Sequence, residues 1–298
     1  MDKVISATDL LNMEYTEIPY LLESVFPKQG LAAVGGSSDT GKSHLLRQVA
    51  MSIVSGEKEF LGLKLNSEHN RVLYVSTEDF EIATSVSLKK QQAELGLTNE
   101  TFKNLSFIFD TTDLIANIES QLQQNPHDLV VIDTFSDLFG NDINQVNQVR
   151  NYLHQYGQLA NKYKCLFLFI HHSGKGTEYK TPSKNSLLGS QGFEGKMRAV
   201  VLLLKSKSDV NLRYFCSVKG NYIEEKMKTE AIELVFNDNL CFQATGNTNL
   251  LEEIKKPEKE NTKSEVLKLQ QSGFSQGEIA DRLGISQPSV SRILSGKS

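Results

Sequence analysis

Nine residues near the start of the chain, 35–43, have the types and spacing needed to bind phosphate. From Gly36 onward the pattern is a glycine, four variable residues, then glycine, lysine and serine, which is the P-loop. Successive backbone N–H groups of such a loop turn inward around the phosphates of a nucleotide. Lys42 would reach the β- and γ-phosphates, and Ser43 would bind Mg²⁺. The nucleotide-binding residues are therefore expected to be Gly36, Ser37, Ser38, Asp39, Thr40, Gly41, Lys42 and Ser43.

The residues on either side of this loop predict the strand and the helix that must hold it. The apolar run 31–34 indicates a buried strand, and the apolar residues after Ser43 recur on one helical face, at Leu45, Leu46, Val49, Ala50 and Ile53. This order places the loop at a helix N-terminus, where the helix dipole favours anions. A glycine turn without function is the alternative, and the intact flanking elements disfavour it.

A second apolar run, 71–75, ends in four polar residues that include Glu78 and Asp79. Acids at the carboxyl end of a parallel strand lie in the crevice where such sheets bind ligands. Glu78 is therefore our candidate for the base that orients or deprotonates the attacking water. The alternative, strongest for Asp79, is that these acids only cap the following helix.

The apolar run 129–132 is closed by Asp133, as in a Walker B strand, where the acid holds Mg²⁺ through a coordinated water. Alone this signal is weak, but downstream of a P-loop it becomes strong. Thr134 stands where a second acid could have followed, which favours Glu78 as the catalytic carboxylate.

A further buried strand, 165–170, ends in His171 and His172. A histidine at this position would lie beside the Walker B carboxylate and could sense the γ-phosphate by hydrogen bonding. Paired histidines also occur in metal sites, but no cysteine or acid at ligand spacing completes a set.

Length and composition set the remaining limits. The 298 residues can form one large α/β domain and a small module. The three cysteines are far apart in apolar stretches, which predicts buried, reduced thiols. No basic-then-apolar leader and no apolar run of about 18 residues occurs, so we expect a cytoplasmic protein without a membrane span.

A lysine-bearing stretch follows the histidines, over residues 174–188. It carries Lys175, Lys180 and Lys184 with Glu178 as its only acid. We interpret it as a loop that contacts a nucleic acid backbone, which would make binding sensitive to salt. A solvated surface loop is the alternative.

The last part of the chain has its own composition. Residues 255–298 hold eight Lys and Arg against five acids, or +3, so the rest of the chain carries −7 of the net −4. We predict an ATPase domain over 1–250, with 1–26 covering its sheet, a charged linker over 251–262 and a helical module over 263–298.

The module has the signals of three short helices. Gly273 ends the first, Ser275 with Glu278 forms a capping box for the second, and a turn at 284–285 precedes the third. The pattern is similar to the helix-turn-helix of bacterial repressors and resolvases. The residues presented to DNA would be Gln287, Ser289, Ser291 and Arg292. A protein-binding helical module is the alternative.

Along the chain stand, in order, the motifs GGSSDTGKS, VLYVSTED, LVVIDT, FIHHSGKG, LLGSQGFEGKMR and SVKGNY. Together they resemble the RecA-like ATPase core of the plasmid RepA-type hexameric replicative helicases, and more distantly that of DnaB and KaiC, over residues 18–245. The P-loop is generic, whereas the other motifs are more specific in combination. The C-terminal module is a departure, because a plain helicase of this type need not carry one.

The resemblance implies a RecA-like P-loop NTPase fold with a mostly parallel central sheet. It implies that Glu78 is the catalytic carboxylate and that His172 senses the γ-phosphate. It also implies that Arg198 is a finger inserted into the neighbouring subunit's site, and that Lys219 approaches the neighbouring nucleotide.

We therefore expect a ring-forming, hexameric DNA motor of a plasmid, phage or mobile element, with ATP and Mg²⁺ as cofactors. Single-stranded DNA would pass through the ring, and the C-terminal module would bind duplex DNA. Two alternatives stay open: a DNA-bound regulatory ATPase that does not unwind DNA, and a recombinase-like filament.

Overall fold

The computed structural model describes residues 4–174, 176–177, 180–207, 209–221, 223–254, 259–283 and 285–295. These residues form two compact units. The first runs to Ile254, apart from residues 176–181. The second contains that short segment and the C-terminal helices.

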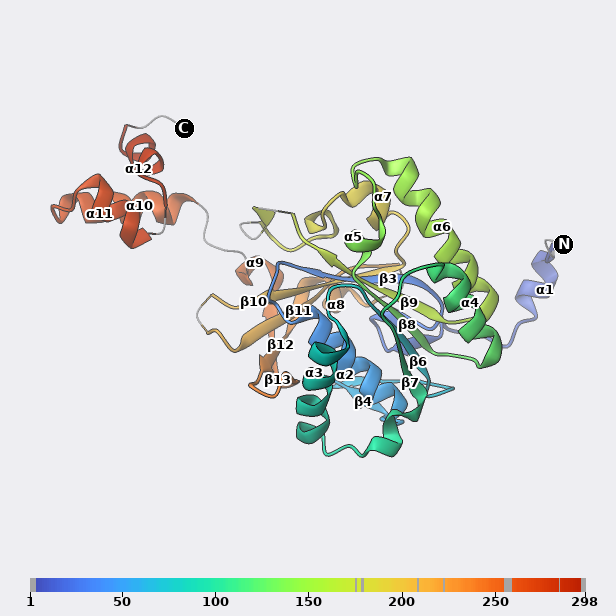
Figure 1. Ribbon diagram of the computed structural model, residues 1–298. Helices are drawn as coiled ribbons and strands as arrows, with labels where there is room; N and C mark the ends of the chain where they lie inside the picture. The colour runs from blue at the N-terminus through green and yellow to red at the C-terminus, as the bar shows by residue number, and fades with distance from the viewer. Residues whose placement is uncertain are drawn as a thin grey trace. The chain divides into compact units, whose positions relative to one another are not determined.

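A nine-stranded sheet forms the centre of the first unit, in the order β13-β12-β11-β10-β3-β9-β8-β6-β7 (Figure 1). The strands from β10 to β7 are parallel, and β11, β12 and β13 extend the sheet in antiparallel fashion. Their bounds are β3 Gly30–Gly36, β6 Val72–Ser76, β7 Leu105–Ile108, β8 Leu129–Asp133, β9 Leu166–His172, β10 Ala199–Lys205, β11 Leu212–Gly220, β12 Glu230–Phe236 and β13 Phe242–Leu250. The predicted α/β class with a mostly parallel sheet is confirmed.

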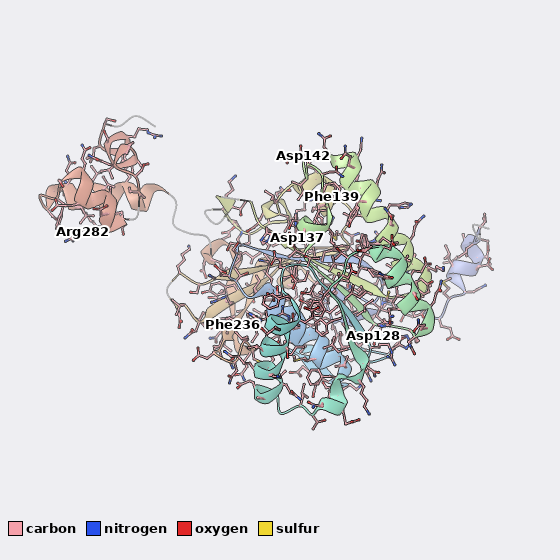
Figure 2. The ribbon with its side chains drawn as sticks, in the orientation of Figure 1. Asp128, Asp137, Phe139, Asp142, Phe236 and Arg282 are labelled. Atoms are coloured by element: carbon pink, nitrogen blue, oxygen red, sulfur yellow. The ribbon has the colours of Figure 1, made fainter. Side chains whose placement is uncertain are left out.

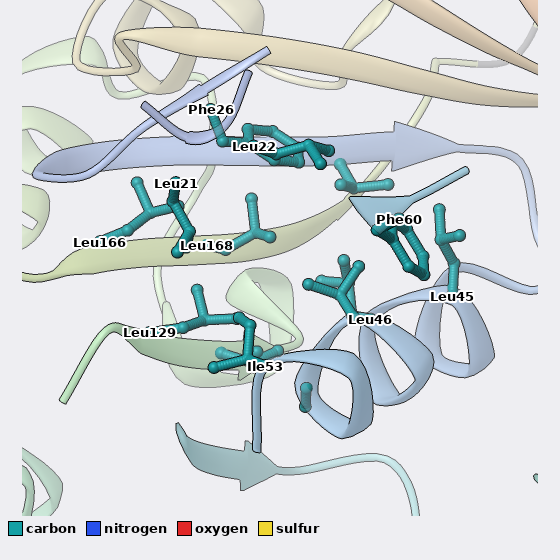
Figure 3. Packing of buried hydrophobic residues seen from close by; sticks show 14 of the residues in the cluster. Leu21, Leu22, Phe26, Leu45, Leu46, Ile53, Phe60, Leu129, Leu166 and Leu168 are labelled. Atoms are coloured by element: carbon teal, nitrogen blue, oxygen red, sulfur yellow. The ribbon is translucent and has the colours of Figure 1, made fainter. Parts of the chain in front are cut away.

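Helices cover both faces of this sheet (Figure 1). The parallel strands are apolar throughout because alternate side chains enter two different cores. On β3, Ala32 and Val34 pack with helix α2 (Lys42–Val54) in a cluster shown in part in Figure 3. Leu31 and Ala33 pack in the cluster that contains α4 (Leu114–Gln124) and α6 (Val146–Tyr163). Helix α3 (Glu81–Glu94) follows β6.

The predicted N-terminal cover is limited to its last residues. The hairpin of β1 (Tyr20–Leu22) and β2 (Phe26–Pro27) buries apolar side chains in the α2 cluster. Residues 4–19 are exposed, and helix α1 (Ala7–Leu11) buries none of its side chains. The expectation that all of 1–26 covers the sheet was therefore wrong for residues 4–19.

The interval predicted as a linker, 251–262, is helical at both of its described ends. Helix α9 (Leu251–Ile254) buries Leu251 and Ile254 against the α4 and α6 cluster, so it belongs to the first unit. Helix α10 begins at Lys259. Strand β13, just before α9, was not predicted because most of its side chains are polar and exposed, which hides the strand period.

Short elements complete the first unit. The described ones are the β4–β5 hairpin (Glu59–Phe60 and Leu63–Lys64), helices α5 (Phe135–Leu138), α7 (Ser190–Glu194) and α8 (Glu225–Thr229), and 3₁₀ turns η1 (Asn99–Asn104) and η3 (Lys184–Ser186). All three cysteines are buried. No helix in the described parts of the chain is long and apolar enough to span a bilayer.

The second unit contains helices α10 (Lys259–Gln271), α11 (Gln276–Leu283) and α12 (Gln287–Leu294). Val266, Ile279, Ala280 and Val290, one or two from each helix, form its buried centre. The predicted capping box is present, since the Ser275 hydroxyl donates to the Glu278 carboxylate and the Glu278 N–H donates back. Three helices with this core confirm the predicted helix-turn-helix region.

Candidate nucleotide-binding site

The P-loop connects β3 to α2, as the sequence predicts. Gly41 is the N-cap of α2 and has φ +93°, a left-handed conformation that favours glycine. A Cβ atom on Gly41 would lie 2.8 Å from the Phe242 ring, and one on Gly36 would lie 2.4 Å from the Leu203 carbonyl oxygen. Both glycines are therefore required by close packing as well as by backbone shape.

Lys42 is buried, and its Nζ donates to the carbonyl oxygen of Ser37 at 2.9 Å. The Thr40 hydroxyl donates to the same oxygen at 3.1 Å. Burial lowers the pKa of Lys42, and the charges of Glu78 and Asp133 oppose this effect. The ammonium group thus stands at the loop within the field of both acids, where a phosphate would be its natural partner.

Asp133 ends β8 and is almost fully buried. The Tyr74 hydroxyl donates to Oδ2 at 2.7 Å, whereas Oδ1 is buried without a hydrogen-bond partner among the described residues. Burial raises the pKa of Asp133, and the nearby Tyr74 and Ser43 hydroxyls oppose the shift. An unpaired buried carboxylate oxygen is costly. Beside Ser43 it fits a Mg²⁺ site, because oxygen donors are what this ion prefers.

Glu78 and His172 face one another at the carboxyl ends of their strands. His172 Nε2 lies 3.5 Å from Glu78 Oε1, and the two side chains are 31% and 47% exposed. His172 is also the register partner of Gly36 across β9 and β3. Both side chains therefore stand at the P-loop end of the sheet, accessible to water, which is where a general base and a γ-phosphate sensor would be needed.

The backbone on both sides of Glu78 is fixed by its neighbours. The Thr77 N–H donates to the Asp133 carbonyl oxygen at 2.7 Å. Asp79 forms an ion pair with Arg47, whose side chain on α2 is fully buried. Asp79 makes no cap for α3, whose N-cap is Phe80. Its carboxylate is engaged in holding α2 to this loop.

The two adjacent histidines have opposite environments, because successive side chains on a strand point to opposite faces. His171 is buried, with Nε2 2.8 Å from the Leu188 carbonyl oxygen and its ring packed on Phe135 and Phe193. Burial lowers the pKa of His171 to about 4, so it is neutral at physiological pH. Only His172 faces the site.

Arg198 lies at the opposite end of the sheet from its own P-loop. Its N–H donates to the Leu31 carbonyl oxygen at 2.7 Å, next to the start of β3, whereas the P-loop follows Gly36 at the end of that strand. Five residues of extended strand separate these points by about 16 Å. The Arg198 side chain is exposed and cannot serve the P-loop of its own chain.

Lys219 lies at the same end of the sheet, paired with Val200 across β10 and β11. Its Nζ is 2.6 Å from Glu194 Oε1 and 2.8 Å from the Glu194 carbonyl oxygen. Lys219 is therefore not placed to bind the nucleotide of its own chain.

The lysines of the basic stretch differ in their surroundings. Lys180 is exposed. Lys184 Nζ lies 3.8 Å from Glu194 Oε1, the carboxylate that also pairs with Lys219. Lys175 lies outside the described residues.

In the helix-turn-helix unit, Gln287, Ser291 and Arg292 are exposed on α12. Ser289 is half-buried, and its hydroxyl is 2.9 Å from that of Ser286 at the N-terminus of the helix. Ser289 thus has a local partner, whereas the other three side chains are available to a ligand. Arg282 on α11 stacks over the Phe274 ring, 4.0 Å from its centroid (Figure 2).

Sequence reasoning missed several residues that shape the site. The Thr77 hydroxyl donates to Asp137 on α5, which brings one more acid to this edge (Figure 2). Arg213 Nε donates to the Thr40 carbonyl oxygen at 3.1 Å, and its guanidinium lies over the Phe236 ring. These contacts join segments far apart in sequence and leave no local pattern. A tyrosine in an otherwise aliphatic strand, Tyr74, was the one signal available.

The strand order, the P-loop and the buried carboxylate at the end of β8 define a P-loop ATPase with a RecA-like core. A family model described as an AAA domain matches residues 3–178, more than half of the chain, and the chain belongs to this family. A helix-turn-helix model matches residues 267–298. No curated protein sequence matches the chain.

Two solved structures are similar in fold. One is an ATPase domain, with TM-score 0.55 and 13% identity over 72% of this chain and 84% of that domain. The other is a KaiC-like protein from the hyperthermophilic archaeon Pyrococcus horikoshii, with TM-score 0.54 and 16% identity over 75% of this chain and 93% of that protein. At these identities the similarity establishes the fold.

Proposed function

We propose that this chain is a cytoplasmic, ATP-hydrolysing DNA motor that works as a ring, a replicative helicase of a plasmid, phage or other mobile element. The position of Arg198 is the observation that carries this proposal. Its exposed guanidinium stands about 16 Å along the sheet from its own P-loop, so it can complete only the site of another copy. A head-to-tail contact of this kind closes into a ring when the rotation permits, and a hexamer is the size we propose.

Within one site, each residue has a distinct task. Lys42 and the N–H groups of the P-loop bind the phosphates, and Ser43 with Asp133 would hold Mg²⁺. Mg²⁺, when bound, neutralises charge that develops on the phosphates. Glu78 accepts a proton from the attacking water or orients it, and Arg198 of the neighbouring copy stabilises the transferring phosphoryl group.

His172 and Lys219 connect the chemistry to the assembly. His172 stands between Glu78 and the end of β3, so it can hydrogen-bond to a γ-phosphate and report its loss through β9. Lys219 would reach a neighbouring nucleotide only after leaving Glu194. Single-stranded DNA would bind along the lysine-bearing stretch, and duplex DNA would bind α12.

A strand-displacement assay on a forked duplex, together with electron microscopy of the ATP-bound protein, tests this function. Rings that displace a strand only with hydrolysable ATP are expected. Filaments without unwinding would contradict the helicase and favour a recombinase-like protein.

The helix-turn-helix unit supports a second candidate, a DNA-bound regulatory ATPase in which ATP controls assembly without unwinding. The observation behind it is the complete three-helix core with exposed Gln287 and Arg292 on α12. ATP-dependent binding to one duplex sequence, with neither rings nor strand displacement, would favour this candidate over the motor.

Removal of the C-terminal unit should separate the two DNA activities. A chain ending at Ile254 should keep its ATPase rate and its assembly, because the first unit has its own core, and should lose preference for one duplex sequence. A gel-shift competition between specific and random duplexes measures this. In the full chain, replacing Gln287 and Arg292 by alanine should cost about 1 to 3 kcal/mol of discrimination for each lost base contact, whereas Lys268→Ala on α10 should not. Unchanged specificity after truncation would contradict the assignment.

Removal of charge from the basic stretch should weaken binding to single strands. Replacing Lys175, Lys180 and Lys184 together by alanine should flatten the salt dependence by up to about 2 units of log–log slope, at roughly 0.7 per phosphate contact. Fluorescence anisotropy of a labelled oligonucleotide over a salt series measures the slope.

A matched variant controls for the loss of three positive charges. It replaces three exposed lysines elsewhere on the first unit, Lys58, Lys64 and Lys103. This variant should keep the original slope. Equal slopes in both variants would mean that the stretch is a solvated surface loop.

A further inference from the structure

One buried hydroxyl group touches both residues of the proposed Mg²⁺ site. The Tyr74 hydroxyl, on β6, donates to Asp133 Oδ2 at 2.7 Å. The same oxygen is 3.4 Å from the carbonyl oxygen of Ser43. Since a hydroxyl carries a single proton, the short contact is the hydrogen bond and the long one is close packing. The phenol therefore stands where strand β8 meets the first turn of α2.

The surroundings of Tyr74 fix its ring. The side chain is fully buried in the α2 cluster, and its ring lies 5.2 Å from that of Phe107, centroid to centroid. The guanidinium of Arg47 lies 5.9 Å from the centre of the Tyr74 ring. Arg47 is itself held by Asp79. With neighbours packed around it, the phenol can present its hydroxyl in only one place.

The hydrogen bond makes the two carboxylate oxygens of Asp133 unequal. Oδ2 has its donor in Tyr74, and Oδ1 is buried with no partner among the described residues. Rotation of the carboxylate would break the bond at Oδ2 and leave a buried acceptor unpaired, which typically costs about 1 to 3 kcal/mol. Oδ1 is thereby held as the oxygen that is free to bind a metal ion or a water on it.

We propose that Tyr74 is a positioning residue that fixes the Asp133 carboxylate for Mg²⁺, and so sets the Mg²⁺ affinity of the nucleotide complex. This inference rests on the nucleotide site proposed above. Groups that orient a metal ligand without touching the metal commonly change metal affinity by about 10- to 100-fold when removed. Phenylalanine keeps the ring of Tyr74 and removes only the hydroxyl, so it isolates this role.

The test is a Mg²⁺ titration of the binding of a fluorescent ATP analogue, measured by anisotropy without turnover. Tyr74→Phe should need about 10- to 100-fold more Mg²⁺ for half-maximal binding than the unaltered protein, and should bind the analogue equally well in EDTA. Mn²⁺ binds such oxygen and nitrogen ligands at least as tightly as Mg²⁺ and should narrow the gap. A half-saturation within twofold of the unaltered protein would overturn the inference.

Two further variants separate positioning from packing. Tyr156→Phe removes another buried hydroxyl, one that is 3.0 Å from the Tyr152 hydroxyl on α6, and should leave the Mg²⁺ titration unchanged. In an Asp133→Asn background, Tyr74→Phe should add nothing to the Mg²⁺ requirement, because the two residues act as one unit. An additive effect there, or weaker binding in EDTA, would make Tyr74 a packing residue. If the unaltered protein binds no nucleotide, the proposed function fails first.

Discussion

Replacing Arg198 by alanine should lower the ATP turnover rate by about 10³- to 10⁵-fold, the range for an arginine that stabilises phosphoryl transfer. ATP binding should persist, because the P-loop lies at the other end of the sheet and is untouched. The measurement is steady-state ATPase rate beside equilibrium binding of a labelled nucleotide. Arg150→Ala, which removes an exposed arginine on α6, should change neither.

Mixing two inactive proteins tests whether Arg198 acts on a neighbouring copy. Lys42→Ala lacks phosphate binding but keeps Arg198, and Arg198→Ala has the opposite defect. In mixed rings a subunit that lacks Lys42 can lend its arginine to a neighbour with an intact P-loop. Subunit exchange should therefore restore part of the ATPase rate.

Exchange itself must be verified, for example by energy transfer between labelled subunits. If exchange occurs and no activity returns, Arg198 does not act between copies. It would then be a cation that only stabilises the edge of the sheet near Leu31.

The second large effect concerns the carboxylate that faces His172. Glu78→Gln should still bind ATP but hydrolyse it at least ~100-fold more slowly, the range for loss of a general base. The amide keeps the shape of the side chain and removes only its ability to take a proton. Lys42→Ala, in contrast, should lose both binding and turnover. Single-turnover hydrolysis and nucleotide binding, measured on each variant, distinguish the two defects.

Glu81→Gln is the matched control, since Glu81 is an exposed acid in the first turn of α3. It should hydrolyse ATP at the normal rate. Normal turnover in Glu78→Gln would sink the assignment. Asp79 would be the next acid to examine, although its ion pair with Arg47 gives it a structural task.

Much of the fold could be predicted from the sequence because its signals are local. The P-loop, the helix that follows it and the capping box at Ser275 each depend on residues within a few positions of one another. The buried parallel strands were recognisable because they are apolar on both faces. Strand β13 and the boundary at Ile254 were missed, because polar edge strands and short docked helices lack such a pattern.

The candidate site was predictable in its members but not in their arrangement. The sequence placed Glu78, Asp133 and His172 each after a buried strand, which puts them at one edge of a parallel sheet. It could not give the pairing of Asp79 with Arg47. That contact depends on how α2 lies across β6, a matter of packing between segments distant in the chain.

By itself the sequence determined that this protein carries a phosphate-binding loop, an acid-ended strand and a C-terminal helix-turn-helix, because each is encoded by spacing within one segment. Only the tertiary structure decided which atoms are left to do chemistry. Strand order placed Arg198 away from its own P-loop, and burial separated His171 from His172. The hydrogen bond from Tyr74 left one oxygen of Asp133 without a partner. These outcomes follow from long-range packing, in which a side chain's role depends on neighbours that the local sequence does not name.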